Sequence, residues 1–187
     1  MKILVLQGSP RREGNTATLL GSFLEGLRAS GKHEIEEVLL HEREIRPCRN
    51  CDACRRMTDR YCVIDDDMQA LFAPFIEADM LVLASPIYWW SISAQLKLFI
   101  DRLYGLNPDS RPEFFKGKKL VLVLTYFDRD PNSGAEIALS MFREIARYTE
   151  MPMAGILRYS SGEQHVRQAP DALAKARELG ERLGAGR

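Results

Sequence analysis

Three runs of branched apolar residues constrain the fold more than any other feature of this sequence. They are ILVL at residues 3–6, MLVLA at 80–84 and LVLVL at 120–124. Strands that are buried on both faces of a parallel sheet have this continuous pattern, whereas half-exposed strands alternate apolar and polar residues. Two weaker strand candidates lie at residues 37–40 and 154–159. We therefore expect five strands.

Segments with helical spacing separate these runs. Apolar residues recur about every 3.6 positions within residues 19–27, 96–103, 137–148 and 172–183. Ser133 and Glu136 match a capping box before the third of these helices. A shorter helix is expected at about 67–76, where Pro74 ends or kinks it.

The alternation of strand and helix predicts an α/β fold. We expect a doubly wound, five-stranded parallel sheet in the order 2-1-3-4-5, with helices on both faces. This is the flavodoxin-like arrangement, in which a ligand binds at the carboxyl ends of strands 1 and 3.

Length and charge place further limits on the chain. Its 187 residues contain no repeat or linker, so we expect a single domain over 1–187. Basic and acidic residues are equal at 26 each, which gives no support for nucleic-acid or membrane partners. Met1 leads directly into the first apolar run without the features of a signal peptide, so a cytoplasmic location is expected.

The loop after the first strand, GSPRREGNT at residues 8–16, has the components of a phosphate site. It offers Ser9, Asn15 and Thr16 as short polar side chains, the guanidinium of Arg11 and the start of a helix. Its glycine spacing fits neither the Walker loop nor the G-x-G-x-x-G fingerprint. A phosphate monoester is favoured over an ordinary polar turn.

The loop after the third strand, SPIYWW at residues 85–90, is rich in aromatic side chains. Aromatic side chains beside free backbone amides suit a planar heteroaromatic ring, although they equally suit a core or a subunit interface. Because this loop and the phosphate loop meet at the same edge of the sheet, the two together indicate FMN.

All four cysteines, Cys48, Cys51, Cys54 and Cys62, lie in one loop at about residues 47–65, on the carboxyl side of the second strand. Their spacing, C-x2-C-x2-C-x7-C, is compact enough for a [4Fe–4S] cluster. Zinc sites with four cysteines usually have two separated C-x2-C pairs, so zinc fits less well. Without a metal, the cysteines are reduced thiols or form a disulfide. Five arginines surround them and favour anionic sulfur: Arg46, Arg49, Arg55, Arg56 and Arg60.

The motifs GSPRREGNT, PCRNCDAC, CVIDDDM and EADMLVLASPIYWWSISAQLKLFIDR occur in this order within residues 2–105. They resemble those of the NADPH-dependent FMN reductase superfamily, and most of all its iron–sulfur flavoprotein branch. The resemblance implies that the FMN phosphate is held by Ser9, Arg11, Asn15 and Thr16. It implies that the isoalloxazine is bordered by Pro86, Ile87, Tyr88 and Trp89. From the topology, we expect the loop after the fourth strand, residues 125–128 with Thr125 first, on the other side of the ring. The resemblance also implies a homodimer or homotetramer.

The expected activity is an FMN-dependent oxidoreductase. It takes hydride from NAD(P)H and passes electrons to a quinone, a nitro or azo compound, or an electron-transfer partner. A cluster held by the cysteines would relay electrons between FMN and that partner. The alternative is a non-catalytic electron carrier or redox sensor on the same fold, with little NAD(P)H turnover.

Overall fold

The structure, a computed structural model, describes residues 1–106 and 109–186. Its strands are β1 (Lys2–Gln7), β2 (Glu34–Leu39), β3 (Met80–Tyr88), β4 (Ser91–Ile92), β5 (Lys119–Tyr126) and β6 (Met153–Ser160). Its α-helices are α1 (Asn15–Ala29), α2 (Met68–Glu77), α3 (Ala94–Arg102), α4 (Ala135–Thr149) and α5 (Pro170–Gly184). None of the described helices is both long enough and apolar enough to cross a membrane.

Five strands form the predicted parallel sheet, in the spatial order β2-β1-β3-β5-β6. The expected count of five was incomplete, because a sixth strand, β4, pairs antiparallel with the end of β3. This strand has only two residues and no apolar run, so the sequence pattern gives no signal for it.

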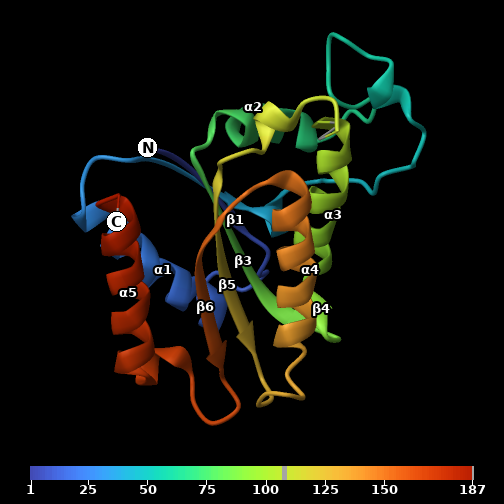
Figure 1. The fold of residues 1–187 in the computed structure, drawn as a ribbon. Helices are drawn as coiled ribbons and strands as arrows, with labels where there is room; N and C mark the ends of the chain where they lie inside the picture. Colours follow the sequence, from blue (N-terminus) through green and yellow to red (C-terminus); the bar gives the residue numbers. More distant parts are fainter. Residues whose placement is uncertain (107–108, 187) are drawn as a thin grey trace.

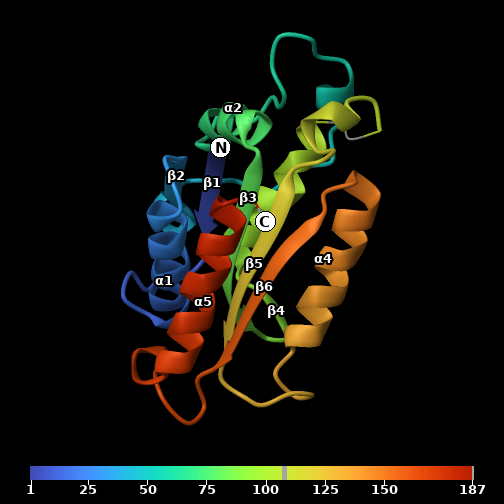
Figure 2. The ribbon, with the colours of Figure 1, turned by 60° about the vertical axis from the view of Figure 1, so that its left-hand side comes forward.

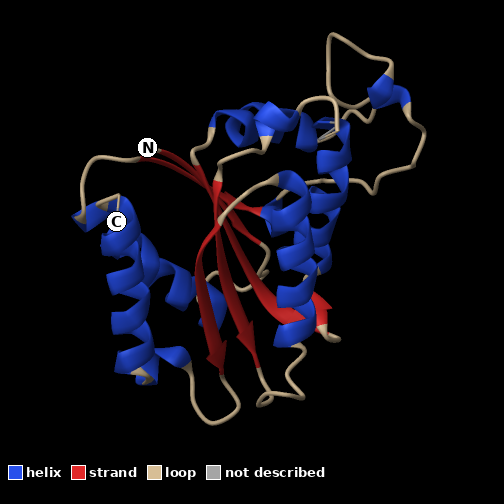
Figure 3. Ribbon diagram, viewed as in Figure 1, coloured by secondary structure: helices blue, strands red, loops and turns tan. Residues whose placement is uncertain are grey.

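Helices cover both faces of the sheet, as Figures 1 and 3 show. Successive side chains of a strand point to opposite faces, so β1 places Leu4 and Leu6 in one core and Ile3 and Val5 in the other. Helices α2, α3 and α4 pack over the first core, and α1 and α5 over the second. Figure 2 shows α1 and α5 side by side on their face.

One local expectation about helices was wrong, and of the two alternatives for Pro74, an end to the helix is excluded. Gly134, with φ of +77°, precedes α4, and Ser133 accepts a hydrogen bond from the backbone of Ala135, so the capping box with Glu136 does not form. Pro74 lies inside α2, which continues to Glu77.

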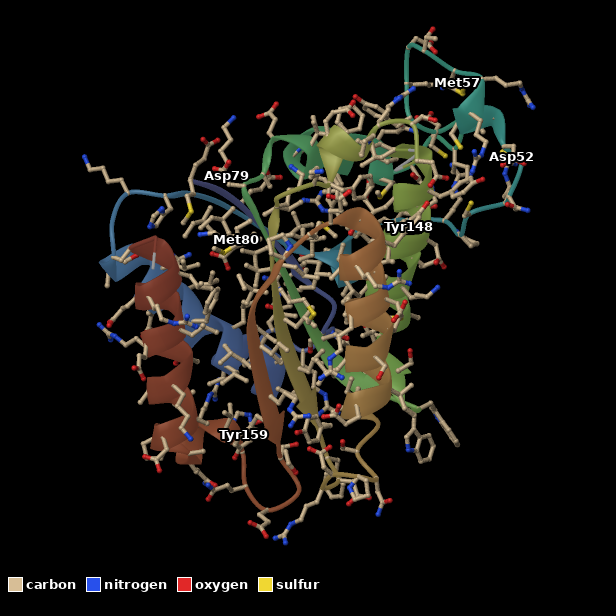
Figure 4. All side chains as sticks on the ribbon, in the orientation of Figure 1. Asp52, Met57, Asp79, Met80, Tyr148 and Tyr159 are labelled. Atoms are coloured by element: carbon tan, nitrogen blue, oxygen red, sulfur yellow. The ribbon has the colours of Figure 1, made fainter. Side chains whose placement is uncertain are left out.

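The position of the cysteine loop also differs from the expectation. Strands β5 and β6 end at the bottom of Figure 1, whereas the loop projects at the top right. Figure 4 shows the same separation, with Asp52 and Met57 of the loop at one end and Tyr159 of β6 at the other. Residues 40–67 therefore carry the cysteines away from the edge at which β2 ends.

Candidate functional site

A hollow at the carboxyl edge of the sheet collects nearly all of the residues predicted to bind FMN. It is formed by the loop after β1, the last residues of β3 and β5, and the residues that follow β5 and β6, because parallel strands end at the same edge. The third strand continues to Tyr88 instead of ending at residue 84, so Pro86, Ile87 and Tyr88 belong to β3 and not to a loop. The predicted residues that line it are Ser9, Arg11, Asn15, Thr16, Pro86, Ile87, Tyr88 and Thr125.

The start of α1 provides the anion-binding end of this hollow. Gly14 precedes the helix, and no side chain caps the free amides of the first turn. The first amides of any α-helix have no partner within the helix, so they can donate to an anion. Arg11 is exposed beside them and forms no ion pair with another described residue.

Two hydrogen bonds fix the polar side chains at the base of the hollow. The hydroxyls of Thr16 and Thr125 are 2.7 Å apart and both are buried, which ties the start of α1 to the end of β5. The side-chain oxygen of Asn15 accepts from the backbone of Val166 at 2.7 Å. Asn15 therefore also holds the segment that leads into α5, and its amide nitrogen is the group left for a ligand.

A strained hairpin forms the aromatic side of the site. Trp89 and Trp90 connect β3 to β4 with φ of +47° and +59°. Two-residue hairpin turns with positive φ at both positions normally contain Asn or Gly, because a bulky side chain is unfavourable there. Trp90 packs against Gly134, where a Cβ would lie only 2.5 Å from the Cα of Trp90.

Trp89 is the predicted residue that the structure does not bring into the hollow. Its residue surface is 89% exposed. It lines a neighbouring hollow with Trp90 and Asn132, and the two hollows share Ile87 and Phe127. Its contact with a flavin ring remains a prediction.

Sequence reasoning missed Ser161, which lines the hollow. Gly14 was considered only as a glycine of the phosphate loop, and Tyr126 and Phe127 only as members of the loop expected on the other side of the ring. Ser161 comes directly after β6, so the end of the fifth parallel strand was the available signal. Burial, followed by the nearby Asp130 carboxylate, raises the pKa of Tyr126, which keeps its hydroxyl protonated.

The four cysteines come together at a second, separate pocket. The pocket is lined by Cys48, Cys51, Cys54 and Cys62, together with Arg102, Tyr104 and Gly105. The last three belong to the far end of α3 and the turn after it, whereas α3 begins at the carboxyl edge. The nine-residue helix spans about 13 Å. The two pockets share no lining residue.

The donor set of this pocket fits a thiolate-ligated group, although its geometry is not preformed. All four cysteines are free thiols, and Cys48 and Cys51 are exposed. Burial raises the pKa of Cys54, and the nearby sulfur of Cys62 raises it further. Among the described residues, no three His, Cys, Asp or Glu side chains are arranged as metal ligands.

A buried ion pair supports the wall of the cysteine pocket. The side chains of Arg102 and Asp66 are each 1% exposed, and the Nη1 atom of Arg102 lies 2.6 Å from Asp66 Oδ2. Burial disfavours the charged form of Asp66, but the hydrogen bonds from Arg102 and from the backbone of Arg46 and Met68 hold its pKa below the usual value.

Comparison with known proteins agrees with this geometry. Residues 1–167 match the family of the NADPH-dependent FMN reductase. An iron–sulfur flavoprotein of Archaeoglobus fulgidus is 37% identical over 116 residues, which are 61% of this chain and 51% of that protein. A putative NAD(P)H-dependent FMN-containing oxidoreductase of Bacillus subtilis, YwqN, is 28% identical over 83% of this chain and 82% of its own.

The fold has solved counterparts as well. An FMN-dependent NADH-azoreductase of Bacillus anthracis, solved in complex with FMN, superposes with a TM-score of 0.74 at 12% identity, covering 98% of this chain and all of the other. The chain spans about half the length of several curated relatives that it matches, all of them iron–sulfur flavoproteins. Because the family match extends over residues 1–167, the chain belongs to the NADPH-dependent FMN reductase family.

Proposed function

We propose that the chain is an NAD(P)H-dependent flavin oxidoreductase that binds FMN in the hollow at the carboxyl edge of the sheet. One observation carries the proposal: a helix start without a side-chain cap and an arginine without an ion pair among the described residues lie in the same hollow as the last residues of β3 and β5. A phosphate suits the helix start and the arginine, and a planar ring suits the backbone and aromatic residues at the other end of the hollow.

The residues of the hollow have separate tasks. The first amides of α1, with Ser9, Arg11, Asn15 and Thr16, hold the phosphate. Pro86 and Ile87 present backbone along one edge of the ring, and Tyr88 stands beside them, 46% exposed. Thr125 fixes the opposite wall through its bond to Thr16. When bound, FMN supplies hydride acceptance and the transfer of one or two electrons.

NAD(P)H is the proposed reductant, and a quinone, a nitro or azo compound, or an electron-transfer partner is the proposed acceptor. The relative YwqN of Bacillus subtilis is named a putative NAD(P)H-dependent oxidoreductase, which supports NAD(P)H as the reductant. The open, aromatic surface of Trp89, Trp90 and Phe127 beside the hollow supports a flat acceptor, since such side chains offer stacking faces.

Steady-state oxidation of NADPH and NADH with benzoquinone under anaerobic conditions tests this activity. We expect the FMN-loaded protein to oxidise at least one of the two nucleotides much faster than the same concentration of free FMN does. A rate equal to that of free FMN would favour an electron carrier over an enzyme.

The cysteine pocket favours this second candidate function, an electron carrier with a [4Fe–4S] cluster. Four thiols line one pocket within a basic loop, and several relatives are named iron–sulfur flavoproteins. When bound, such a cluster supplies one-electron transfer. The expected relay between FMN and a partner is not supported within one chain, because the two pockets lie at opposite ends of α3.

We also propose that residues 1–187 form a single cytoplasmic domain that assembles as a homodimer or homotetramer, without nucleic-acid or membrane partners. Exposed Trp89, Trp90 and Phe127 beside the hollow support self-association, because large exposed apolar groups commonly mark interfaces. Light scattering after size-exclusion chromatography gives the mass; a monomer at micromolar concentration would contradict the assembly.

A further inference from the structure

Arg102 has a feature that its ion pair with Asp66 does not explain. Its Nη1 and Nη2 atoms donate to the Asp66 carboxylate at 2.6 and 3.2 Å, and Nη1 also donates to the carbonyl of Arg46 at 2.9 Å. The remaining nitrogen, Nε, is buried and has no hydrogen-bond partner among the described residues. A buried donor without a partner leaves the loss of its hydration uncompensated, so it calls for an acceptor.

The nearby acceptor candidate is the sulfur of Cys62. Arg102 and Cys62 line the same pocket. No hydrogen bond between Arg102 Nε and Cys62 forms in the structure of the chain alone.

Cys62 is also the cysteine that the body of the protein holds in place. Gln69 of α2 donates from its Nε2 atom to the carbonyls of Cys62 and Ile64, at 2.8 and 2.6 Å. The preceding Tyr61 packs its ring 5.2 Å from that of Phe72. Cys48 and Cys51, by contrast, are exposed. An arginine fixed by Asp66 therefore faces a cysteine fixed by α2.

We infer that Arg102 is a positioning residue of the cysteine pocket, whose Nε–H donates a hydrogen bond to the Cys62 sulfur once that sulfur is a cluster ligand. Hydrogen bonds to ligand sulfur stabilise the reduced, more negative state of a cluster and raise its reduction potential. Asp66 orients the guanidinium by occupying its other two nitrogens. This inference rests on the proposed cluster site.

The midpoint potential of the cluster, followed by EPR in anaerobically reconstituted protein, tests this role. Arg102→Lys keeps the positive charge near Asp66 but removes the planar Nε–H, so we expect a more negative potential than in the wild type. Arg43→Lys makes the same exchange at an exposed position that does not line the cysteine pocket, and it is expected to leave the potential unchanged. Equal potentials in the wild type and Arg102→Lys would overturn the inference while leaving the cluster site intact.

Iron content separates this outcome from failure of the cluster site itself. We expect about four iron atoms per wild-type chain after reconstitution. Less than about one would overturn the cluster proposal, and the role of Arg102 with it.

A second measurement covers the case in which Arg102→Lys does not fold. In protein labelled with ¹⁵N-arginine, with Arg46, Arg49, Arg55, Arg56 and Arg60 changed to lysine, we expect pulsed EPR of the reduced cluster to show coupling to an arginine nitrogen. The absence of that coupling would overturn the inference without any change at position 102.

Discussion

At the scale of single residues, the Asp66–Arg102 pair shows how much depends on burial. Arginine and aspartate are rarely buried to this degree unless they are paired. Breaking such a pair leaves one charge without compensation in a poorly solvated place, which typically costs about 3–5 kcal/mol. The pair also joins α3 to the segment that follows the cysteines, so it stabilises the chain and shapes the pocket.

Asp66→Asn is therefore expected to lower the free energy of unfolding at pH 7 by several kcal/mol, about 3–5 from breaking a buried pair. The pKa of Asp66 is below its usual value in the folded state. Its contribution to stability is thus complete above the unfolded pKa of about 3.9 and is lost as the pH falls through the folded pKa. The difference between wild type and variant should shrink on acidification below about pH 4.

Urea unfolding from pH 7 to pH 3.5 measures this difference. Asp65→Asn, at the exposed neighbouring position, serves as the control and should change stability little at any pH. A difference in the free energy of unfolding between wild type and Asp66→Asn that is small at pH 7, or that grows in acid, would contradict the role assigned to the pair.

Which residues line the hollow could be predicted, because they lie at or just after the ends of the predicted strands. The loop at residues 8–16 follows the first strand and the residues SPIY end the third, and parallel strands end at one edge. The role of Arg102 was not predictable, because a single arginine at the end of an amphipathic helix is normally expected to be exposed to solvent. Its burial depends on Asp66, 36 residues away.

At the scale of elements, the contact between α1 and α5 depends on missing side chains. A Cβ at Gly180 would lie 2.1 Å from the carbonyl oxygen of Phe23, and one at Gly26 would lie 2.0 Å from that of Arg177. These are backbone atoms in helices and cannot move aside independently. The two glycines therefore set how closely the helices approach.

Gly180→Ala is expected to destabilise the protein, since overpacking typically costs about 1–3 kcal/mol. The intrinsic preference runs the other way, because alanine in a helix is favoured over glycine by roughly 0.5–1 kcal/mol. Gly21→Ala, in α1 with open space around its Cβ, should show that preference and stabilise the chain. Thermal unfolding of both variants distinguishes the signs; stabilisation by both would mean that the helices are not in close contact.

The periodicity of apolar residues predicted the long strands and the helices, whereas it did not predict the irregular segments. The long apolar runs and the 3.6-residue stripes identified five parallel strands and five helices in the observed order. The hairpin of β3 and β4 was not predicted, because Trp89 and Trp90 occupy its turn at positive φ, where turn rules predict Asn or Gly. Packing against Gly134 accounts for part of what holds this turn in place.

At the scale of the whole molecule, the hollow and the cysteine pocket are separate sites. Sequence order suggested that they adjoin, because the cysteines follow β2 in the chain. The long connection instead runs back to the far end of α3, guided by the contacts of Tyr61, Asp66 and Tyr104. The path of a 28-residue connection between β2 and α2, residues 40–67, is not encoded in local periodicity.

Replacing all four cysteines by serine is consequently expected to leave FMN affinity within about twofold of the wild type. The two pockets have no lining residue in common, so loss of the thiols changes nothing in the hollow. Titration of flavin fluorescence against each protein checks this prediction. A loss of tenfold or more in affinity would indicate that the loop reaches the flavin, for instance in an assembly of several chains.

The central claim is that the hollow at the carboxyl edge binds FMN through its phosphate loop. The most direct measurement is an FMN binding isotherm for the wild type and for two neighbouring variants, Arg11→Gln and Arg12→Gln. Arg11 lines the hollow, whereas Arg12 pairs with Glu42 outside it. A charge-assisted hydrogen bond contributes about 1.5–3 kcal/mol, which corresponds to roughly 10- to 100-fold in affinity.

We predict one FMN per wild-type chain, affinity that is weaker by about this factor in Arg11→Gln, and affinity within about twofold of the wild type in Arg12→Gln. A wild-type chain that binds no FMN, or two variants that lose affinity equally, would contradict the account.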